Sequence, residues 1–399
     1  MTQRLLSLSN GHGEDLNASL ILRSLQAQIP SLAITAISLV GRGQAYRRAG
    51  IAVIGPASNL PSGGLIYTHP LNYFKDIWSG LICLTLQQFR TVRQRSRPCD
   101  LLLATGDVVP ILMAYLTGRP YVAFLVSTSS FYEGRLRLPL MTKFCLRSRR
   151  CLQIFTRDAH TAQDLNRQGM SKAIFAGYPI MDALIPTGRD LGLIPNLPMI
   201  ALLPGSRLPE ALENLKLQLQ LCEQVRQLQN MQFCAAIVPS IREADLEAIA
   251  AALSWQYRPG YLTKSLSPTA AVEVRCYQDA FPDVLRQCVL AIGMAGTAVE
   301  QAVGLGKPVV QIPGQGPQFT YQFAEAQMRL LGRSVQTIGH RRANKAVFYS
   351  AAQRIVKTLQ NPNYLKDCNA NGYQRVGPAG GSEAIAQRLQ KLLQKISAV

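Results

Sequence analysis

The chain alternates short apolar runs with longer segments of helical periodicity from its first residues onward. Between two such runs, the segment Leu16–Gln28 places Leu16, Leu20, Leu22 and Leu25 at helical spacing. Alternation of strands and helices is typical of parallel βαβ units, which build a doubly wound domain. The strands predicted in this first half are Leu5–Leu8, Ile34–Val40, Leu101–Ala104, Tyr121–Val126 and Ile154–Thr156.

Proline and glycine interrupt this pattern between residues 179 and 198, a segment with four prolines and two glycines. It predicts a linker, 179–198, between an N-terminal domain, 1–178, and a second α/β domain, 199–370. The elements predicted after the linker are the strands Ile200–Leu203, Cys234–Val238, Val289–Ile292 and Val309–Ile312 and the helix Glu210–Leu228.

The end of the chain, residues 371–399, predicts a C-terminal helix. Within Ser382–Ile396, the side chains of Ile385, Leu389 and Ile396 fall on one helical face, so this helix could pack back on the N-domain. Ligands of doubly wound sheets bind at the carboxyl ends of the strands. We therefore expect an α/β protein of two doubly wound Rossmann-like domains facing a central cleft, with a C-terminal helix.

Length and composition agree with two globular domains, because 399 residues exceed the roughly 100 to 200 that one domain holds. The 42 basic against 23 acidic residues give a net charge of +19, which would attract nucleic acid, anionic lipid or phosphorylated substrates. A basic but merely solvated surface is the plain alternative. Because no recognised nucleic-acid-binding motif accompanies the charge, we expect lipid rather than nucleic acid.

Nine cysteines, an odd number without a CxxC pair, match neither a disulfide framework nor a zinc site, and predict a reducing, cytoplasmic location. Met1 leads directly into Leu5–Leu8 without a basic region or a cleavage site, so no signal peptide is expected. The most apolar stretch, Leu101–Leu116, is interrupted by Asp107 and Pro110 and is too short to span a membrane. Membrane contact should therefore be peripheral, at the cytoplasmic face.

The first candidate for chemistry is the turn after the strand Leu5–Leu8. Gly11 and Gly13 let its backbone approach a ligand, and His12 between them could act as a base. The plain alternative is an ordinary βα turn in which Glu14 or Asp15 complements the helix N-terminus.

A second candidate, Asp107, follows the strand Leu101–Ala104 at the edge where α/β enzymes place reactive groups. A carboxylate in apolar surroundings could hold a raised pKa that suits a general base. The alternative is that Asp107 serves only as the N-cap of the next helix.

Two loops of the second domain suit a diphosphate. The string Leu203–Arg207 follows a strand and offers backbone donors, Gly205 and Ser206 among them, together with the guanidinium of Arg207. The string Gly293–Glu300 also follows a strand, and its small residues leave a helix N-terminus open to an anion. Glu300 could accept hydrogen bonds from ribose hydroxyls, or it could simply lie on a solvated helix face.

These strings resemble those of lipid-A-disaccharide synthase. The similarity rests on Leu203–Arg207 with Glu210 and Asn214 and on Gly177–Asp182, and it extends from residue 1 to about 330. The segment Gly293–Glu300 is also similar to the N-acetylglucosaminyltransferase of peptidoglycan synthesis, whose Gly-Gly-His turn is closer to Asn10–Asp15 than the turn of the lipid-A enzyme is. Residues 375–382 look like lipid-A-synthase-related proteins of cyanobacteria and plastid-related lineages.

The resemblance implies a GT-B fold that binds the acceptor mainly with the first domain and the nucleotide-sugar with the second. It gives Glu300 to the ribose, Arg207 to the diphosphate and a catalytic role to Asp107, and it gives the backbone near Tyr277 and Gln278 to the uracil. The implied substrate-binding residues are Gly11, Gly13, Glu14, Gly205, Ser206, Tyr277, Gln278, Gly296, Thr297, Glu300, Gln315, Gln318, Thr320 and Tyr321.

A membrane-facing region is predicted in the first domain. Residues 72–84 form an apolar stretch with an aromatic end, which suits interfacial insertion. Between Arg90 and Arg150, eleven basic residues outnumber three acidic ones and alternate with aromatic side chains such as Phe144. The alternative is a packed helix with solvated arginines.

Together these features predict an inverting glycosyltransferase that moves a hexosyl or N-acetylhexosaminyl group from a UDP-sugar to a membrane-associated lipid or glycolipid. The base is Asp107 or His12, and Arg207 stabilises the leaving diphosphate. No cofactor or metal is expected, because no DxD-like pair follows a predicted strand. A UDP-N-acetylglucosamine 2-epimerase and a non-catalytic lipid-binding protein on the same scaffold are the alternatives, and the sugar, the acceptor and the oligomeric state stay open.

Overall fold

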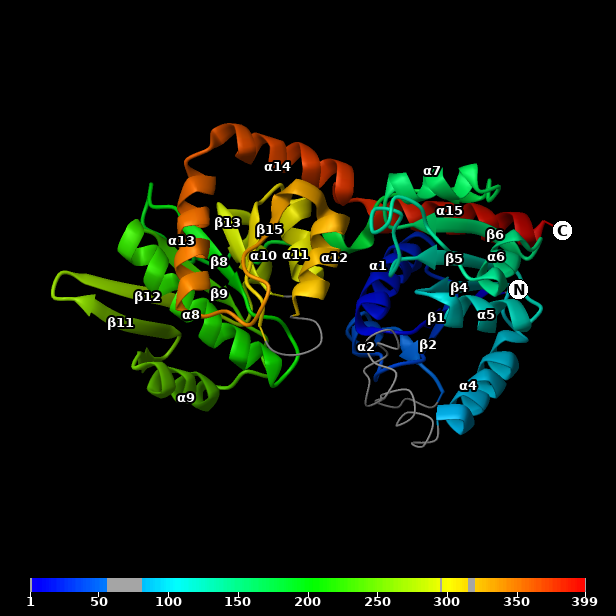
Figure 1. Ribbon diagram of the computed structural model, residues 1–399. Helices are drawn as coiled ribbons and strands as arrows, with labels where there is room; N and C mark the ends of the chain where they lie inside the picture. Colours follow the sequence, from blue (N-terminus) through cyan, green and yellow to red (C-terminus); the bar gives the residue numbers. More distant parts are fainter. Residues whose placement is uncertain (1, 56–80, 295, 315–319, 399) are drawn as a thin grey trace. The chain divides into compact units, whose positions relative to one another are not determined.

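The computed structural model describes residues 2–55, 81–294, 296–314 and 320–398. Residues 72–80 of the predicted interfacial stretch, the side chains of residues 81–84, and the candidates Gln315 and Gln318 lie outside this description. The chain folds into two compact units (Figure 1). One contains the residues up to Ala183 together with those from Pro378 onward, and the other is Leu184–Gly377.

The first unit is built on a parallel sheet whose described strands have the order β3-β2-β1-β4-β5-β6-β7. The chain enters in the middle at β1, adds β2 and β3 on one side and then β4 to β7 on the other, which is the doubly wound arrangement. Right-handed crossovers therefore place helices on both faces of the sheet. The strands are β1 (Arg4–Ser9), β2 (Ala33–Ser38), β3 (Ala52–Val53), β4 (Leu101–Thr105), β5 (Tyr121–Leu125), β6 (Cys151–Thr156) and β7 (Ala173–Ile174), and the helices are α1 (His12–Gln28), α2 (Gln44–Arg48), α4 (Leu81–Ser96), α5 (Val108–Leu116), α6 (Leu140–Arg147), α7 (Ala159–Arg167), the 3₁₀ turn η1 (Pro179–Ala183) and α15 (Gly381–Ser397).

Burial on both faces explains why the strands of this unit could be recognised in the sequence. Every residue of β4 and of β5 is buried. A parallel strand covered by helices on both sides is apolar along its whole length rather than at alternate positions. The predicted strands of the first half are therefore confirmed, with small shifts at their ends.

The second unit is also doubly wound, but its sheet is mixed. The described strands have the order β10-β11-β12-β9-β8-β13-β14-β15, in which β10, β11 and β12 pair antiparallel and the others pair parallel. The strands are β8 (Met199–Leu203), β9 (Gln232–Ala236), β10 (Gln256–Arg258), β11 (Tyr261–Ser267), β12 (Ala270–Tyr277), β13 (Leu290–Gly293), β14 (Val309–Gln311) and β15 (Val335–Thr337), and the helices are α8 (Glu210–Leu228), α9 (Glu243–Leu253), α10 (Phe281–Gln287), α11 (Gly296–Gly304), α12 (Tyr321–Leu331), η2 (Gly332–Ser334), α13 (Lys345–Leu359) and α14 (Pro362–Arg375).

The helix predicted within Ser382–Ile396 is present as α15, whereas the first residues of the C-terminal segment 371–399 belong to another helix. Residues up to Arg375 belong to α14 in the second unit, and only α15 belongs to the first unit, where it packs against α1. Gly377, with a φ of 89°, and Pro378 separate the two helices, because neither residue continues a helix there. The division of the chain after Ala183 also lies inside the predicted linker 179–198 rather than at either of its ends.

Two further expectations from the sequence concern the state of the cysteines and the presence of membrane-spanning helices. The eight cysteines whose side chains the structure describes are free thiols, and all of them except Cys276 are buried. In the same ranges, the helices are all too short or too polar to cross a membrane.

Candidate active site

In the first unit, the loops after β1, β2 and β4 lie at one edge of the sheet, because these strands run parallel. The register places the end of β1, Ser9, beside Ser38 of β2 and Thr105 of β4. Two of these loops hold the candidates named from the sequence, namely residues 10–13, which lead into α1, and residues 106–107, which lead into α5. The fold thus brings the two loops side by side.

Asp107 is held from both of these loops. Its Oδ1 accepts a hydrogen bond from the backbone N of Val109 at 2.9 Å, as the N-cap of α5, and a second from Asn10 Nδ2 at 2.6 Å. The cap that was the plain alternative is therefore present. Burial raises the pKa of the Asp107 carboxyl, although the two hydrogen bonds act in the opposite direction. A positioned carboxyl with a raised pKa is suited to accept a proton from a hydroxyl group.

Gly106 lies where Asn10, Glu14 and Asp107 meet. Its φ is 134°, and a Cβ there would lie 2.0 Å from Asn10 Oδ1 and 3.4 Å from Glu14 Cγ, so only glycine fits. Glu14 accepts a hydrogen bond from Ser127 Oγ, in the loop after β5. Asn10 and Ser127 are thus members of this polar cluster that the sequence patterns did not indicate.

His12 begins α1 and is exposed, with Gly11 and Gly13 on either side. A Cβ on Gly41 would lie 2.9 Å from His12 Cε1, so the imidazole packs over the loop that follows β2. Strands β2 and β4 flank β1 on opposite sides. His12 and Asp107 therefore lie toward opposite sides of the end of β1, as two separate candidates for the base.

A second carboxyl, Asp15, is buried beneath the same turn. Its side chain is 1% exposed, and it accepts hydrogen bonds from Ser9 Oγ at 2.6 Å and from Ser38 Oγ at 2.8 Å. The Tyr46 hydroxyl lies 2.6 Å from Ser9 Oγ. Burial raises the pKa of Asp15 to about 6, despite the two hydroxyl donors. This cluster connects β1, β2 and α1 and so fixes the turn that carries His12.

Because the folded-state pKa of Asp15 lies above the unfolded value, its contribution to stability should be complete below about pH 4 and lost as the pH rises through 6. The shift from 3.8 to about 6 corresponds to about 3 kcal/mol, at about 1.36 kcal/mol for each pH unit. We expect Asp15→Asn to remove this loss, so that the variant gains unfolding free energy relative to the parent between pH 4 and pH 7. Urea unfolding at several pH values measures the difference, and Glu133→Gln, at an exposed carboxylate of the same unit, should leave it unchanged. Parallel pH profiles for Asp15→Asn and the parent would contradict this expectation.

In the second unit, the ends of β8 and β13 lie side by side. Leu203 pairs with Gly293 in parallel register, and Met294 N donates to the Leu203 carbonyl oxygen at 3.1 Å. The loop after β8 carries Gly205, Ser206 and Arg207, and the segment after β13 leads into α11. The fold therefore brings the Arg207 loop next to the start of α11.

Buried amides on α8 hold the backbone beneath this edge. Asn214 Nδ2 donates to the Pro204 carbonyl oxygen at 3.0 Å, and one turn later Gln218 Nε2 donates to the Ile292 carbonyl oxygen at 3.1 Å. Both side chains are fully buried, whereas Arg207 is exposed in the loop above them. The buried amides therefore anchor the backbone next to the loop that carries the Arg207 guanidinium.

The start of α11 holds three further candidates. Gly296 and Thr297 form its first turn, and Glu300 lies in its second turn, half-buried. A Cβ on Gly296 would lie 3.7 Å from Phe323 Cζ, so α11 begins against α12. The N-terminus of a helix carries a partial positive charge, which favours a phosphate at this position.

Thr320 and Tyr321 lie at the beginning of α12. Thr320 is the N-cap, whose hydroxyl accepts from Phe323 N at 3.4 Å, and the Tyr321 ring lies 4.3 Å from the His340 ring. Because α12 packs against α11, both residues begin a helix adjacent to the candidate phosphate position.

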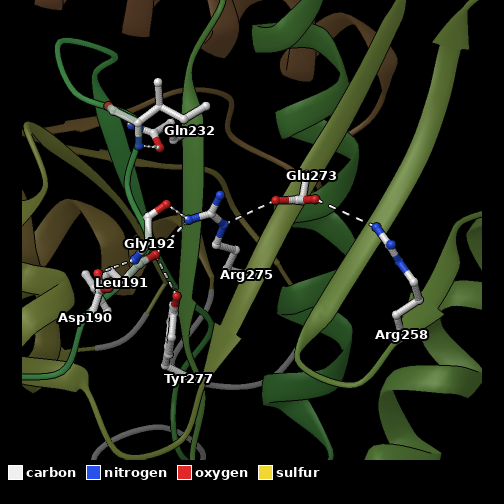
Figure 2. A network of polar contacts seen from close by, with 9 residues as sticks. Asp190, Leu191, Gly192, Gln232, Arg258, Glu273, Arg275 and Tyr277 are labelled. Carbon is white, nitrogen blue, oxygen red and sulfur yellow. Dashed lines mark hydrogen bonds and ion pairs between the residues drawn. The ribbon is translucent and has the colours of Figure 1, made fainter.

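Tyr277, at the end of β12, belongs to a polar network at the side of the sheet (Figure 2). Its hydroxyl donates to the Leu191 carbonyl oxygen at 2.9 Å, to which Arg275 also donates at 2.7 Å. Gln278 Nε2 donates to the Ile241 carbonyl oxygen at 2.7 Å. The side chains of Tyr277 and Gln278 therefore bind neighbouring loops. The expected contact with the uracil would be made by the backbone of residues 277–278.

The motif Gly177–Asp182, which carried part of the resemblance, binds the C-terminal helix. Asp182 accepts hydrogen bonds from Gly380 N and, at 2.7 Å, from Ser382 N. A Cβ on Gly177 would lie 2.6 Å from Gly381 Cα, so the two backbones touch. The first turn of α15 therefore packs against this motif. The Asp182 carboxylate stabilises the partial positive charge at the N-terminus of the helix.

Solved structures identify the fold. The chain matches CalG4, the calicheamicin glycosyltransferase, with a TM-score of 0.64 and 16% identity over 99% of both chains. It matches the UDP-GlcNAc 2-epimerase from Neisseria meningitidis bound to UDP-GlcNAc, with a TM-score of 0.57 and 14% identity over 98% of this chain and 100% of that one. The protein has the two-domain GT-B fold that glycosyltransferases and these epimerases share, as the sequence predicted.

One relative is similar in sequence as well. The lipid-A-disaccharide synthase of Geobacter sulfurreducens is 26% identical over 238 residues, which are 55% of this chain and 57% of the relative. The predicted resemblance to that enzyme is therefore confirmed, and the chain matches little more than half of the relative's length. No family model matches the chain.

Proposed function

We propose that the protein transfers a hexosyl or N-acetylhexosaminyl group from a UDP-sugar to a lipid or glycolipid acceptor, with inversion at the anomeric carbon. The observation that carries this proposal is the sheet edge of the second unit, where Arg207 and the N-terminus of α11 follow adjacent strands. Both features favour a diphosphate. The GT-B fold and the similarity to lipid-A-disaccharide synthase support the same activity.

In this proposal the second unit binds the donor. Arg207 and the first turn of α11, with Gly296 and Thr297, stabilise the charge that develops on the diphosphate as it leaves. Glu300 accepts hydrogen bonds from the ribose, and the backbone of residues 277–278 binds the uracil. Gln315, Gln318, Thr320 and Tyr321 approach the sugar. The epimerase that shares the fold was solved with UDP-GlcNAc, which supports a UDP-sugar as ligand.

The first unit binds the acceptor and supplies the base. Asp107 removes the proton from the acceptor hydroxyl through Oδ2, because Oδ1 is engaged by Asn10 and Val109. The acceptor oxygen bonds to the anomeric carbon as the bond from that carbon to the diphosphate oxygen breaks, and UDP leaves. Asn10 acts as a positioning residue, and His12 is the alternative base at the same edge.

A lipid acceptor requires contact with a membrane. We therefore propose that the protein works as a peripheral enzyme at the cytoplasmic face of an anionic membrane. Its net charge of +19 supports attraction to such a surface. The similarity to an enzyme named for the synthesis of the lipid A disaccharide supports a glycolipid acceptor.

The second candidate function is a UDP-N-acetylglucosamine 2-epimerase, because solved epimerases share the fold over nearly the whole chain. The two activities differ in their need for an acceptor. An epimerase converts the UDP-sugar without one and releases no transferred product, whereas a transferase consumes an acceptor for each UDP that it releases.

The test is UDP release by the full-length protein from a panel of UDP-sugars, with and without a native lipid extract. We expect release to depend on the extract and to form a sugar–lipid product. Epimerised UDP-sugar without extract would establish the alternative instead. If UDP release exceeds the background of the Arg207→Ala variant in no combination and no epimerised UDP-sugar forms, both enzymatic proposals are wrong and the protein is a non-catalytic binder.

A further inference from the structure

Helix α6 of the first unit is apolar on both of its faces. Thr142, Cys145 and Leu146 are buried and attach the helix to the core. On the opposite face, Leu140 is 85% exposed, Phe144 59% and Met141 54%. A helix at a protein–water boundary normally carries polar side chains on its outer face. Three large apolar side chains there indicate a surface that is covered by something else.

The apolar surface continues from α6 onto α5. The ring of Phe144 lies 5.5 Å from that of Tyr115 in an edge-to-face contact, and the next residue of α5, Leu116, is 50% exposed. The two helices pack side by side in the first unit (Figure 1). Leu116, Leu140, Met141 and Phe144 are called the α5–α6 face below.

Basic residues are frequent in the segment that contains α6. Residues 134–150 contain six Lys and Arg and no Asp or Glu. Arg147 is exposed one turn after Phe144, and Arg150 lies over the Tyr115 ring at 5.2 Å. Exposed apolar and aromatic side chains with cations beside them match the boundary of an anionic bilayer, where the apolar groups insert and the cations meet headgroups.

The same charges argue against a second copy of the chain on this face. A symmetric dimer would place the face against itself, so Arg147 and Arg150 of one copy would lie near the same cations of the other. An anionic lipid surface supplies the opposite charge for these cations.

We propose that the α5–α6 face is the surface by which the protein docks on anionic membranes, with Leu140, Met141 and Phe144 inserted at the headgroup boundary. This inference rests on the proposed function in one respect: a lipid acceptor requires contact with a membrane, and the α5–α6 face would make that contact. It is carried by described residues and does not depend on residues 72–80.

The test is flotation of the full-length protein with vesicles of phosphatidylcholine alone and of phosphatidylcholine mixed with phosphatidylglycerol. We expect binding to the mixed vesicles that weakens at high salt. The triple variant Leu140→Ser, Met141→Ser, Phe144→Ser should bind about 100-fold more weakly, because it removes most of the inserted hydrocarbon. The double variant Arg147→Gln, Arg150→Gln should bind about 30-fold more weakly, at low salt only.

The matched control is Leu228→Ser, Tyr349→Ser, Tyr373→Ser, which removes three exposed apolar side chains from the second unit and should bind vesicles as the parent does. Circular dichroism and a cooperative thermal unfolding transition check that every variant is folded. Unchanged vesicle binding by the α6 triple variant would overturn the proposal. A dimeric parent that becomes monomeric in this variant, as measured by light scattering, would also overturn it and assign the face to a second copy.

The outcome separates this inference from the proposed function. If vesicle binding depends on α6 but the protein turns over no UDP-sugar, the docking surface is supported and the transferase proposal is wrong. If the protein turns over a UDP-sugar but its α6 variants bind vesicles as the parent does, the transferase proposal is supported and the docking surface is wrong.

Discussion

Replacing Asp107 by asparagine should lower kcat for sugar transfer by about 100- to 10,000-fold, the range that a general base contributes. Asparagine keeps an oxygen that can accept from Val109 N, so the N-cap of α5 should survive. It has no carboxylate to take the proton of the acceptor hydroxyl. The affinity for UDP, measured by calorimetry, should stay unchanged, because the residue lies in the first unit and the proposed donor site in the second.

The pH dependence of the parent adds a second readout for Asp107. A base must be ionised to act, so kcat/KM should fall on the acid side as Asp107 becomes protonated. Because burial raises the pKa of this carboxyl, the fall should occur at a higher pH than for an ordinary aspartate. His12→Gln is the comparison variant. If it loses kcat while Asp107→Asn retains it, His12 is the base and the assignment to Asp107 is wrong.

Replacing Arg207 by alanine should lower kcat/KM by about 100- to 1,000-fold, the usual effect of removing one preorganised donor from a developing negative charge. The guanidinium contacts the leaving diphosphate in our proposal, so kcat should fall more than UDP binding does. Arg207→Lys should recover only part of the activity, because an ammonium group cannot bind two phosphate oxygens in parallel.

The control for Arg207 is Arg354→Ala, which removes an exposed cation from α13 of the same unit. It changes the net charge equally and should leave kcat/KM within about twofold, since screened charges away from a site act weakly. Equal losses in the two variants would mean that Arg207 acts only through the overall charge of the unit.

The central parallel strands of both sheets could be predicted because they are buried on two sides and so appear as unbroken apolar runs, as in Leu101–Ala104 and Ile200–Leu203. The parallel strands β3, β7 and β15 were not predicted, because two or three residues are too few for a recognisable run. The antiparallel edge was missed. In β11 and β12 the burial alternates, with Leu262, Val272 and Val274 buried between exposed or half-exposed neighbours. The turn residues Pro259-Gly260 and Pro268 between these short strands were the available signal.

The sequence predicted a member of the candidate site only where a single charged residue follows a predicted strand. Asp107 and Arg207 follow apolar runs directly, so sequence position alone indicates them. Asn10 and Ser127 are ordinary polar loop residues in the sequence. They join the site because β1 and β5 lie on either side of β4, an arrangement that depends on strand order. Asp15 was assigned at most to the helix terminus, whereas three buried hydroxyl-bearing residues from β1, β2 and α2 surround it.

The docking of α15 on the motif Gly177–Asp182 has a consequence for biosynthesis. The second unit is complete once Gly377 has left the ribosome, whereas the first unit lacks a helix of its core until Gly381–Ser397 has been made. The half that is synthesised first should therefore be the half that matures last, because α1 and the Asp182 carboxylate lack their partner until α15 has been made.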